Sequence, residues 1–161
     1  MILAKAADTL NAKDSTTDPV FVDSNVLVYT RDSGHPDKQR RAAEWMADLW
    51  RSKRGRLSFQ VLTEYYVNVT KKLHPGLDQE IARQDVQALL AWKPIGLDNR
   101  VLEQAWRTQD RHRLNFWDAL IVGAAHIGAC RYLLTEDLQD GQEIGNVRVV
   151  NPFQSAPGSI A

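Results

Sequence analysis

The chain has 161 residues, of which 43% are hydrophobic and 25% are charged, which excludes a largely disordered protein and suits one domain with a single core. Its 20 basic side chains are balanced by 20 acidic ones, which excludes a uniformly cationic surface that would attract nucleic acid over long distances. No apolar stretch is long enough to cross a bilayer, and the single cysteine, Cys130, has no partner for an internal disulfide. We therefore expect a cytoplasmic protein with no membrane partner.

The N-terminal segment, residues 1–18, lacks the long apolar region that a secretory signal needs. We expect a flexible or weakly helical leader there and assign no function to it. The folded domain is expected to span residues 19–153, without an internal linker or repeat. The closing residues 154–161, QSAPGSIA, are expected to form a disordered tail.

The domain alternates short apolar runs with longer segments of helical periodicity. The first run, residues 20–22, is Val-Phe-Val and predicts a buried strand. Further strands are predicted at 57–59, within 131–137 and within 147–153, with a brief strand or extended turn at 94–98. Apolar side chains recur at helical spacing in five segments, which are 37–53, 60–73, 78–92, 99–109 and 115–129. In the third of these, the positions predicted to face inward are Ile81, Val86, Leu89 and Leu90.

Strands that alternate with helices favour an α/β fold, and we predict a three-layer α/β/α sandwich around a mostly parallel central sheet. In such sheets the functional crevice lies at the carboxyl ends of the strands, where the following loops and helix starts converge. Acidic residues occupy several of these positions in the sequence, so their arrangement decides how the function is interpreted.

Four carboxylates follow a predicted strand or lie near the start of a predicted helix: Asp23, Glu64, Asp118 and Asp137. Each alone has a structural explanation, because Asp23 can cap a helix, Glu64 and Asp118 suit helix starts, and Asp137 can initiate a turn. Together they have another explanation, since a parallel sheet brings the carboxyl ends of its strands to one edge. Carboxylates that cluster there repel one another unless a cation is present.

The residue types at this edge indicate which cation would bind. Carboxylate oxygens suit Mg²⁺ or Mn²⁺, whereas Zn²⁺ is usually held by imidazole and thiolate ligands. No two of the four histidines stand at metal-ligand spacing in the sequence, so we expect them on the surface or packed within the fold. These histidines are His35, His74, His112 and His126.

Four motifs contain these acids in order along the chain. They are VFVDSNVLVY at 20–29, SFQVLTEYYVNVTKKL at 58–73, NFWDALIVGAA at 115–125, and LLTEDLQDG at 133–141 followed by VRVVNPF. FWDALIVGAA and LLTEDLQDG are the most specific of them. In this order the motifs resemble the PIN domain family, the nuclease fold of VapC-type toxins, over residues 19–153.

The resemblance implies a metal-dependent endoribonuclease, a hydrolase of phosphodiester bonds, in which the four carboxylates bind one or two Mg²⁺ or Mn²⁺ ions. It also suggests Asp140 as a further ligand. Glu136 neighbours Asp137 but would point to the opposite face of a strand-like backbone, so Asp137 is preferred. Three side chains would hydrogen-bond to the ligands and orient them: Ser24, Asn25 and Thr135.

An RNA substrate also needs positive charge that holds its flanking phosphates. The first candidates lie in two basic clusters: Lys38, Arg40, Arg41, Arg51, Lys53, Arg54 and Arg56. A second set consists of Lys71, Lys72, Arg111 and Arg113. Single-stranded or looped RNA suits a narrow acid pocket better than a duplex does. The five tryptophans lie in helical patterns, which favours core packing over base stacking for most of them.

The resemblance further implies a homodimer and, for toxin members of the family, a small antitoxin protein that occupies the active-site groove. Two rival functions remain open. A PIN-like module that binds RNA or a protein without cutting would lack one of the acids, and all four are present. A nucleotide-binding domain of flavodoxin or Rossmann type would need a glycine-rich turn after the first strand, where VDSNVLVY has none.

Overall fold

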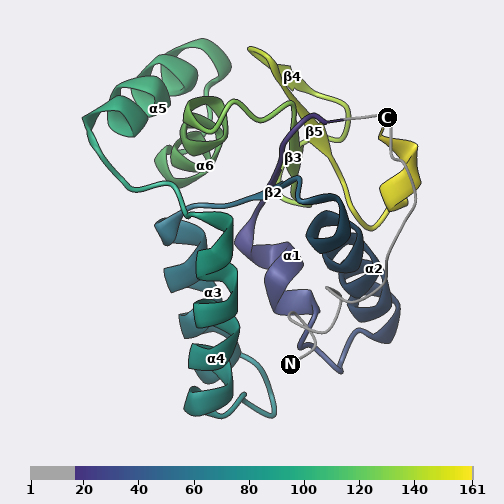
Figure 1. The fold of residues 1–161 in the computed structure, drawn as a ribbon. Helices are drawn as coiled ribbons and strands as arrows, with labels where there is room; N and C mark the ends of the chain where they lie inside the picture. The colour runs from purple at the N-terminus through teal and green to yellow at the C-terminus, as the bar shows by residue number, and fades with distance from the viewer. Residues whose placement is uncertain (1–16, 161) are drawn as a thin grey trace.

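A computed structural model describes residues 17–160 of the chain (Figure 1). Apart from its last two residues, the leader expected at 1–18 lies outside the described residues, as does residue 161. The described part of the chain folds into helices around one central sheet, which confirms the predicted α/β class.

The sheet of the described residues has five strands in the order β2-β1-β3-β5-β4. Their bounds are β1 (Val20–Val22), β2 (Gly55–Arg56), β3 (Tyr132–Leu134), β4 (Glu143–Ile144) and β5 (Val147–Val150). Strands β2, β1, β3 and β5 run parallel to one another, and β4 is antiparallel to β5. The sheet is therefore mostly parallel, as predicted, and the carboxyl ends of four strands lie at one edge.

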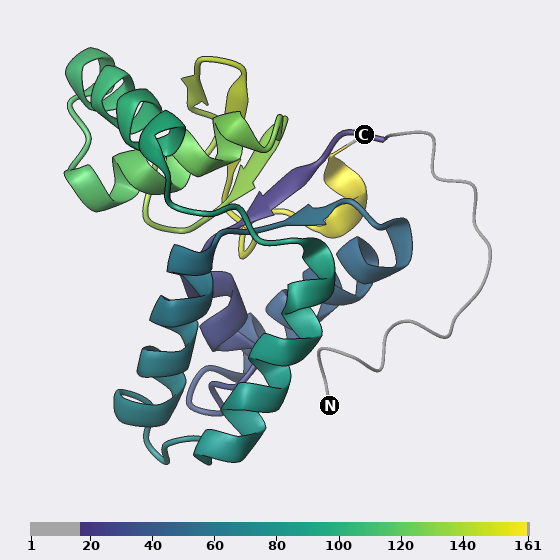
Figure 2. The ribbon, with the colours of Figure 1, turned by 60° about the vertical axis from the view of Figure 1, so that its left-hand side comes forward.

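Helices lie on both faces of the sheet and also extend beyond its edge (Figures 1 and 2). Helices α5 and α6 cover one face, α2 lies on the other, and α3 and α4 pack against each other beside α1. Their bounds are α1 (Ser24–Tyr29), α2 (Pro36–Ser52), α3 (Phe59–Lys71), α4 (Gln79–Leu89), α5 (Asn99–His112) and α6 (Phe116–Ile127), with short 3-10 turns η2 (Leu90–Trp92) and η3 (Pro157–Ser159). Among the described residues, no helix is both long and apolar enough to span a membrane.

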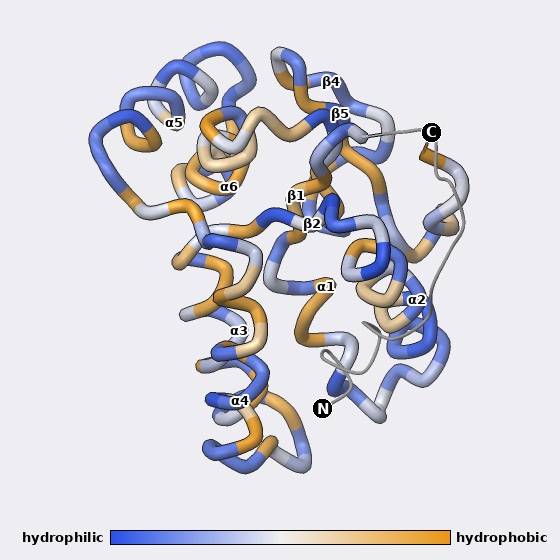
Figure 3. Tube along the Cα trace, viewed as in Figure 1, coloured by the Kyte–Doolittle hydropathy of each residue, from blue (hydrophilic) through white to orange (hydrophobic). Residues whose placement is uncertain are grey.

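The core is one cluster that joins the sheet to α1, α2, α3 and α6. All three residues of β1 are completely buried, and α6 is buried along the whole stretch 119–125. Figure 3 shows the contrast between the apolar α6 and the largely hydrophilic α5 that covers it. The two helices approach closely at Gly123, where an added Cβ atom would lie 3.0 Å from the carbonyl oxygen of Val101. Burial of these apolar surfaces is the main force that holds the helices on the sheet.

The strand register determines which residues leave the sheet together. Val22 of β1 aligns with Leu134 of β3, which in turn aligns with Val150 of β5. The backbone N–H of Asp23 donates to the Leu134 carbonyl at 3.0 Å, and that of Thr135 donates to the Val150 carbonyl at 3.2 Å. Asp23 and Thr135 therefore emerge side by side at the carboxyl edge.

The second strand lies earlier in the chain than predicted. It was expected at 57–59, whereas β2 is Gly55–Arg56. The reason is that Ser58 already caps α3, since its hydroxyl accepts a hydrogen bond from the Val61 N–H at 3.3 Å. A single bridge between Ser58 and Ile95 is the remaining strand-like pairing at this point.

The C-terminal residues also differ from the expectation of a disordered tail. Residues 154–160 contain η3, which lies against α2. The indole N–H of Trp45, a completely buried residue of α2, lies 3.0 Å from the carbonyl oxygens of both Pro152 and Ser155. These hydrogen bonds fix the last described segment to the helix.

The inward face of α4 and η2 differs from the prediction as well. Ile81 and Leu90, predicted to face the core, are 40% and 43% exposed, and α4 buries Asp85 instead. Arg31 donates to both carboxylate oxygens of Asp85, at 2.9 and 2.6 Å, and the Tyr65 hydroxyl also donates to this carboxylate. This buried ion pair connects α4 to α3 and to the turn after α1.

Candidate active site

Four elements bring the predicted carboxylates to the carboxyl edge of the sheet. Asp23 directly follows β1 and caps α1, since its Oδ1 accepts from the Ser24 backbone N–H at 2.7 Å. Glu64 lies on α3, and Asp118 lies in the first turn of α6. Asp137 lies in the loop after β3. Asp23 is therefore both the N-cap of α1 and a member of the carboxylate cluster.

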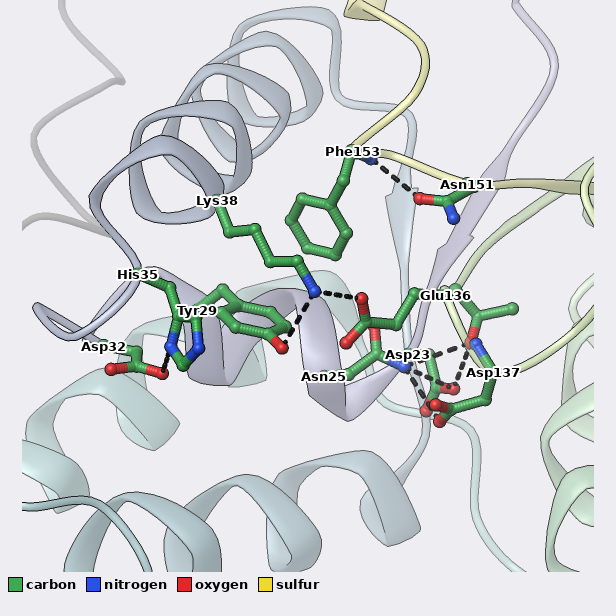
Figure 4. Close-up of polar contacts among 11 residues, drawn as sticks. Asp23, Asn25, Tyr29, Asp32, His35, Lys38, Glu136, Asp137, Asn151 and Phe153 are labelled. Carbon is green, nitrogen blue, oxygen red and sulfur yellow. Dashed lines mark hydrogen bonds and ion pairs between the residues drawn. The ribbon is translucent and has the colours of Figure 1, made fainter.

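Asn25 bridges two of the carboxylates (Figure 4). Its Nδ2 group donates to Asp23 Oδ2 at 3.2 Å and to Asp137 Oδ2 at 3.0 Å. The same group lies 3.1 Å from the Thr135 hydroxyl, which donates to Asp23 Oδ2 at 2.8 Å and accepts from the Asp137 N–H at 3.1 Å. Asn25 and Thr135 thus hold Asp23 and Asp137 in one network.

Glu64 and Asp118 are held by other polar side chains. The Ser24 hydroxyl donates to Glu64 Oε2 at 2.7 Å, and Gln60 donates to Glu64 Oε1 at 2.8 Å. Asn115 caps α6 by accepting from the Asp118 N–H at 2.9 Å, and its amide donates to Asp118 Oδ2 at 2.5 Å. Gln60 and Asn115 were not predicted as site residues. The available signal was their spacing of four and three residues from an acid on the same helix.

The cluster disfavours negative charge. The pKa of Asp23 is raised from its ordinary value of 3.8 to about 7, chiefly by burial and also by the nearby charges of Asp137 and Glu64, against hydrogen bonds from Thr135 and Ser24 that lower it. Burial also raises the pKa of Asp118, with repulsion from the same two carboxylates. A cation close to these groups would reverse both effects, because it favours their ionised forms.

The donor set fits a hard divalent cation in its chemistry, because it consists of carboxylate, amide and hydroxyl oxygens without imidazole or thiolate. The Oδ1 atom of Asn25 is buried and has no hydrogen-bond partner, so it is an acceptor that a cation or its bound water could use. Among residues 17–160, however, no three Asp, Glu, His or Cys side chains are arranged as the ligands of one ion. Their oxygens are instead bonded to amide and hydroxyl groups, which a cation would partly displace.

Glu136 and Asp137 point in different directions (Figure 4). Glu136 accepts from the Lys38 amino group at 2.5 Å, and this amino group also donates to the Tyr29 hydroxyl at 3.1 Å. The same nitrogen lies 4.5 Å and 5.0 Å from the ring centroids of Tyr29 and Phe153. Lys38, a predicted RNA contact, thus lies near the acid edge with its charge already paired.

Two predicted site residues lie elsewhere in the structure. Asp140, the suggested further ligand, accepts from the backbone N–H of Asn151 at 2.8 Å and has no contact with the four carboxylates. Its role is to fasten the loop to the segment after β5. Arg54, a predicted RNA contact, is only 4% exposed, and its Nε donates to the Asp18 carbonyl at 2.9 Å. The prediction that Arg54 contacts RNA at the surface is therefore wrong, because its guanidinium group is buried.

The other predicted RNA contacts lie mainly along α2 and just after it. From Lys38 to Arg51 the helix rises by about 20 Å, so these charges are spread along its length. Three of the arginines pair with acids one turn away, as Arg40–Asp37, Arg41–Glu44 and Arg51–Asp48. Lys53 caps the helix, and Arg56 donates to the carbonyls of Lys53 and Gly55. Lys71 and Lys72 lie at the end of α3, and Arg111 and Arg113 at the end of α5.

The tryptophans divide into buried and exposed residues. Trp45 and Trp92 belong to the core, and Trp50 contacts it, in agreement with the helical pattern. Trp106 and Trp117 are instead 52% and 65% exposed. Trp117 is the more informative of the two, because it immediately precedes Asp118 in the first turn of α6.

The sheet and its acidic edge together define the class of the protein, an α/β domain with carboxylates at the carboxyl edge of a mostly parallel sheet. Residues 20–139, well over half of the chain, match the family described as PIN domain. The chain therefore belongs to the PIN domain family. The match begins at β1 and includes all four carboxylates, whereas β4 and β5, which complete the sheet, follow it. No curated protein matches the chain.

Proposed function

We propose that this PIN domain is a Mg²⁺- or Mn²⁺-dependent endoribonuclease that hydrolyses phosphodiester bonds of single-stranded or looped RNA. One observation carries the proposal: four carboxylates gather at the carboxyl edge, where Asn25 bridges Asp23 and Asp137 and where Ser24 reaches Glu64. The ionised forms of Asp23 and Asp118, whose pKa values are raised, destabilise the fold, and groups with such shifted pKa values concentrate at functional sites.

The four carboxylates would hold one or two divalent cations, with Asn25 Oδ1 as an additional oxygen at the same place. A bound divalent cation supplies a water of lowered pKa and stabilises the negative charge that develops on the phosphate oxygens. The absence of imidazole and thiolate groups from the donor set supports Mg²⁺ or Mn²⁺ over Zn²⁺.

The protein's own contribution is to position these oxygens. Asn25 and Thr135 fix the orientation of Asp23 and Asp137, and the buried position of Asp23 removes its carboxylate from bulk water. Asp118 lies in a first helical turn and is only partly buried, so it is placed to accept the proton of an attacking water.

The exposed indole of Trp117 supports a substrate with unpaired bases. A base that stacks on an aromatic side chain contributes about 1–3 kcal/mol to binding, and bases are free to do so in single strands or loops. Since Trp117 precedes Asp118, a stacked base would place its neighbouring phosphate close to the acids. A duplex would keep its bases away from the indole.

We further propose that the protein is the toxin of a toxin–antitoxin pair, active in the cytoplasm as a homodimer and inhibited by a small antitoxin that covers the acid edge. The support for this is the resemblance of its four motifs to VapC-type toxins. Expression of the wild type in a bacterial host is expected to arrest growth, and expression of Asp118→Asn is not. Growth arrest by both proteins, or by neither at equal expression, would contradict the toxin proposal.

A PIN-like module that binds RNA without cutting is the competing proposal. It is favoured by the finding that no three of the described Asp, Glu, His or Cys side chains are arranged as ligands of one ion. The two proposals differ in one property, since both predict RNA binding but only the nuclease predicts shorter products that depend on a cation.

The test is cleavage of a labelled pool of single-stranded RNA in Mg²⁺, in Mn²⁺ and in EDTA. Asp118→Asn keeps the shape of the side chain and is expected to lose cleavage, whereas Asp110→Asn, an exposed control on α5, is expected to keep it. Melting curves show whether each variant is folded. Wild-type cleavage by Asp118→Asn would refute its role, and a folded wild type that binds RNA without cutting would favour the binding module.

A further inference from the structure

A pocket lies away from the acid edge, between α5, α6 and the turn from β4 to β5. Its volume is about 230 Å³. We call it the α5–α6 pocket, and the lining residues that matter here are Arg107, Thr108, Arg111, His112, His126 and Gly145. In Figure 1, these elements lie together at the top, and α1, which begins at the acid edge, lies below the sheet.

The α5–α6 pocket is lined by basic side chains and by no carboxylate. The side chains of Arg111 and His112 make no hydrogen bond or ion pair with another described residue. Arg107 has one acidic neighbour, Glu103, at 3.7 Å, and both of these side chains are mostly exposed. Burial lowers the pKa of His126, and the nearby His112 lowers it further. Arg107 and Arg111 therefore supply the positive charge of the pocket, and that of Arg111 has no ion pair with a described residue, whereas His126 favours its neutral form.

Thr108 adds a hydroxyl group to the wall of the pocket. The residue as a whole is 3% exposed, and its hydroxyl is not one of the buried polar atoms that lack a hydrogen-bond partner, which fits a group that faces the open pocket. Because Thr108 lines the pocket, its hydroxyl is positioned for a ligand there.

Gly145 shapes the opposite wall. Its φ of +60° places it in the left-handed region, and an added Cβ atom would lie 2.6 Å from Cε1 of His126. The turn from β4 to β5 therefore approaches the imidazole more closely than a larger residue would allow.

The pocket and the acid edge are at opposite ends of α6. Asp118 lies in the first turn of this helix and His126 in its last turn. Eight residues of helix correspond to a rise of about 12 Å, so one ligand group cannot occupy both places. The α5–α6 pocket is therefore a separate site.

We propose that the α5–α6 pocket binds a phosphate ester of about mononucleotide size. Arg107 and Arg111 at its mouth pair with the phosphate oxygens, and Thr108 donates a hydrogen bond from deeper in the pocket. At roughly 30 Å³ per water molecule, the volume corresponds to about eight waters, which exceeds the need of a phosphate ion alone. The phosphate ester comes either from a free nucleotide or from an RNA strand that continues toward the acid edge.

Isothermal titration in EDTA tests this proposal independently of RNA cleavage, because cleavage by the acid edge would need a divalent cation. The probes are inorganic phosphate, 5′-AMP and a short single-stranded RNA. The variants are Arg111→Gln and Thr108→Val, with Arg83→Gln on the exposed face of α4 as the control. We expect both pocket variants to bind the preferred probe about tenfold more weakly, and the control to bind like the wild type.

The preferred probe identifies the source of the phosphate. Tighter binding of 5′-AMP than of RNA, weakened in both pocket variants, identifies a free nucleotide as the ligand. Weaker RNA binding in both variants, with 5′-AMP bound no better than inorganic phosphate, identifies the RNA strand. The proposal is overturned if the folded wild type binds none of the probes, or if folded Arg111→Gln and Thr108→Val bind them as the wild type does.

Discussion

Replacement of Asp23 by asparagine is expected to stabilise the fold above neutral pH in EDTA while it abolishes RNA cleavage. Asp23 is 5% exposed, and burial raises its pKa from 3.8 to about 7. Its ionised form therefore destabilises the native state unless a proton or a cation compensates. Asparagine has nearly the same shape without the charge, so the variant separates the cost of the carboxylate from its function.

The magnitude and the pH window follow from proton linkage. Between about pH 4 and pH 7, folded protein retains a proton on Asp23 that the unfolded chain has lost, so the free energy of unfolding falls as the pH rises. At about 1.4 kcal/mol per pKa unit, the loss reaches roughly 4 kcal/mol above pH 7. Asparagine avoids this loss but turns an amide toward the Asn25 amide, which offsets about 1 kcal/mol. The expected net gain at pH 8 is about 3 kcal/mol.

Urea unfolding of the wild type and Asp23→Asn, measured in EDTA from pH 5 to pH 8.5, tests this prediction. The gain should be smallest at pH 5 and should grow toward pH 8, whereas Asp110→Asn should show no gain at any pH. A variant that is no more stable than the wild type at pH 8, or a difference that does not change with pH, would refute the reasoning.

Three further predictions concern stability and RNA binding. Asp85→Ala is expected to lower the free energy of unfolding by about 3–5 kcal/mol in urea, because it leaves a buried cation unpaired, and a loss below 1 kcal/mol would contradict this. Trp117→Ala should weaken single-stranded RNA binding by about 1–3 kcal/mol in an anisotropy assay, whereas Trp106→Ala should not, and equal losses would argue against stacking. Gly55→Ala should cost about 1–3 kcal/mol in thermal unfolding, since its Cβ would lie 2.2 Å from the Trp92 ring, and wild-type melting would contradict that close contact.

The elements with strong local patterns were predictable from the sequence. The Val-Phe-Val run of β1 and the apolar body of α6 are buried as predicted, and the alternation of strands and helices gave the correct fold class. β2 was placed too late because it has only two residues, too few for periodicity to locate it. Its position depends on pairing with β1 and on the cap of α3, which are contacts between distant parts of the chain.

Charged residues in the interior were not predictable by the same means. Asp85 is buried on α4 because Arg31, 54 residues earlier, donates two hydrogen bonds to it, and a local hydrophobic pattern carries no signal for this partner. Arg54 was likewise expected on the surface, because the local sequence carries no signal for the Asp18 carbonyl to which its buried side chain donates. Trp117 shows the opposite case, since its helical context favoured the core, but its place at the start of α6 exposes it.

The gathering of the acids was predictable because it follows from topology. Parallel strands end at one edge, so residues after β1 and β3 must lie close together, and Asp23 and Asp137 share Asn25 there. The exclusion of Asp140 was not predictable, because it depends on the path of a loop that binds the segment after β5. The hydrogen bonds from the Gln60 and Asn115 amides to Glu64 and Asp118 were not predictable either, because they depend on how these side chains are oriented.

Binding of Mn²⁺ measured by isothermal titration tests the central claim, that these carboxylates act as one cation site, most directly. The wild type is expected to bind one or two ions, Asp118→Asn to bind them much more weakly, and Asp140→Asn to bind them like the wild type. Equal binding by all three folded proteins, or a loss of binding in Asp140→Asn alone, would contradict the account.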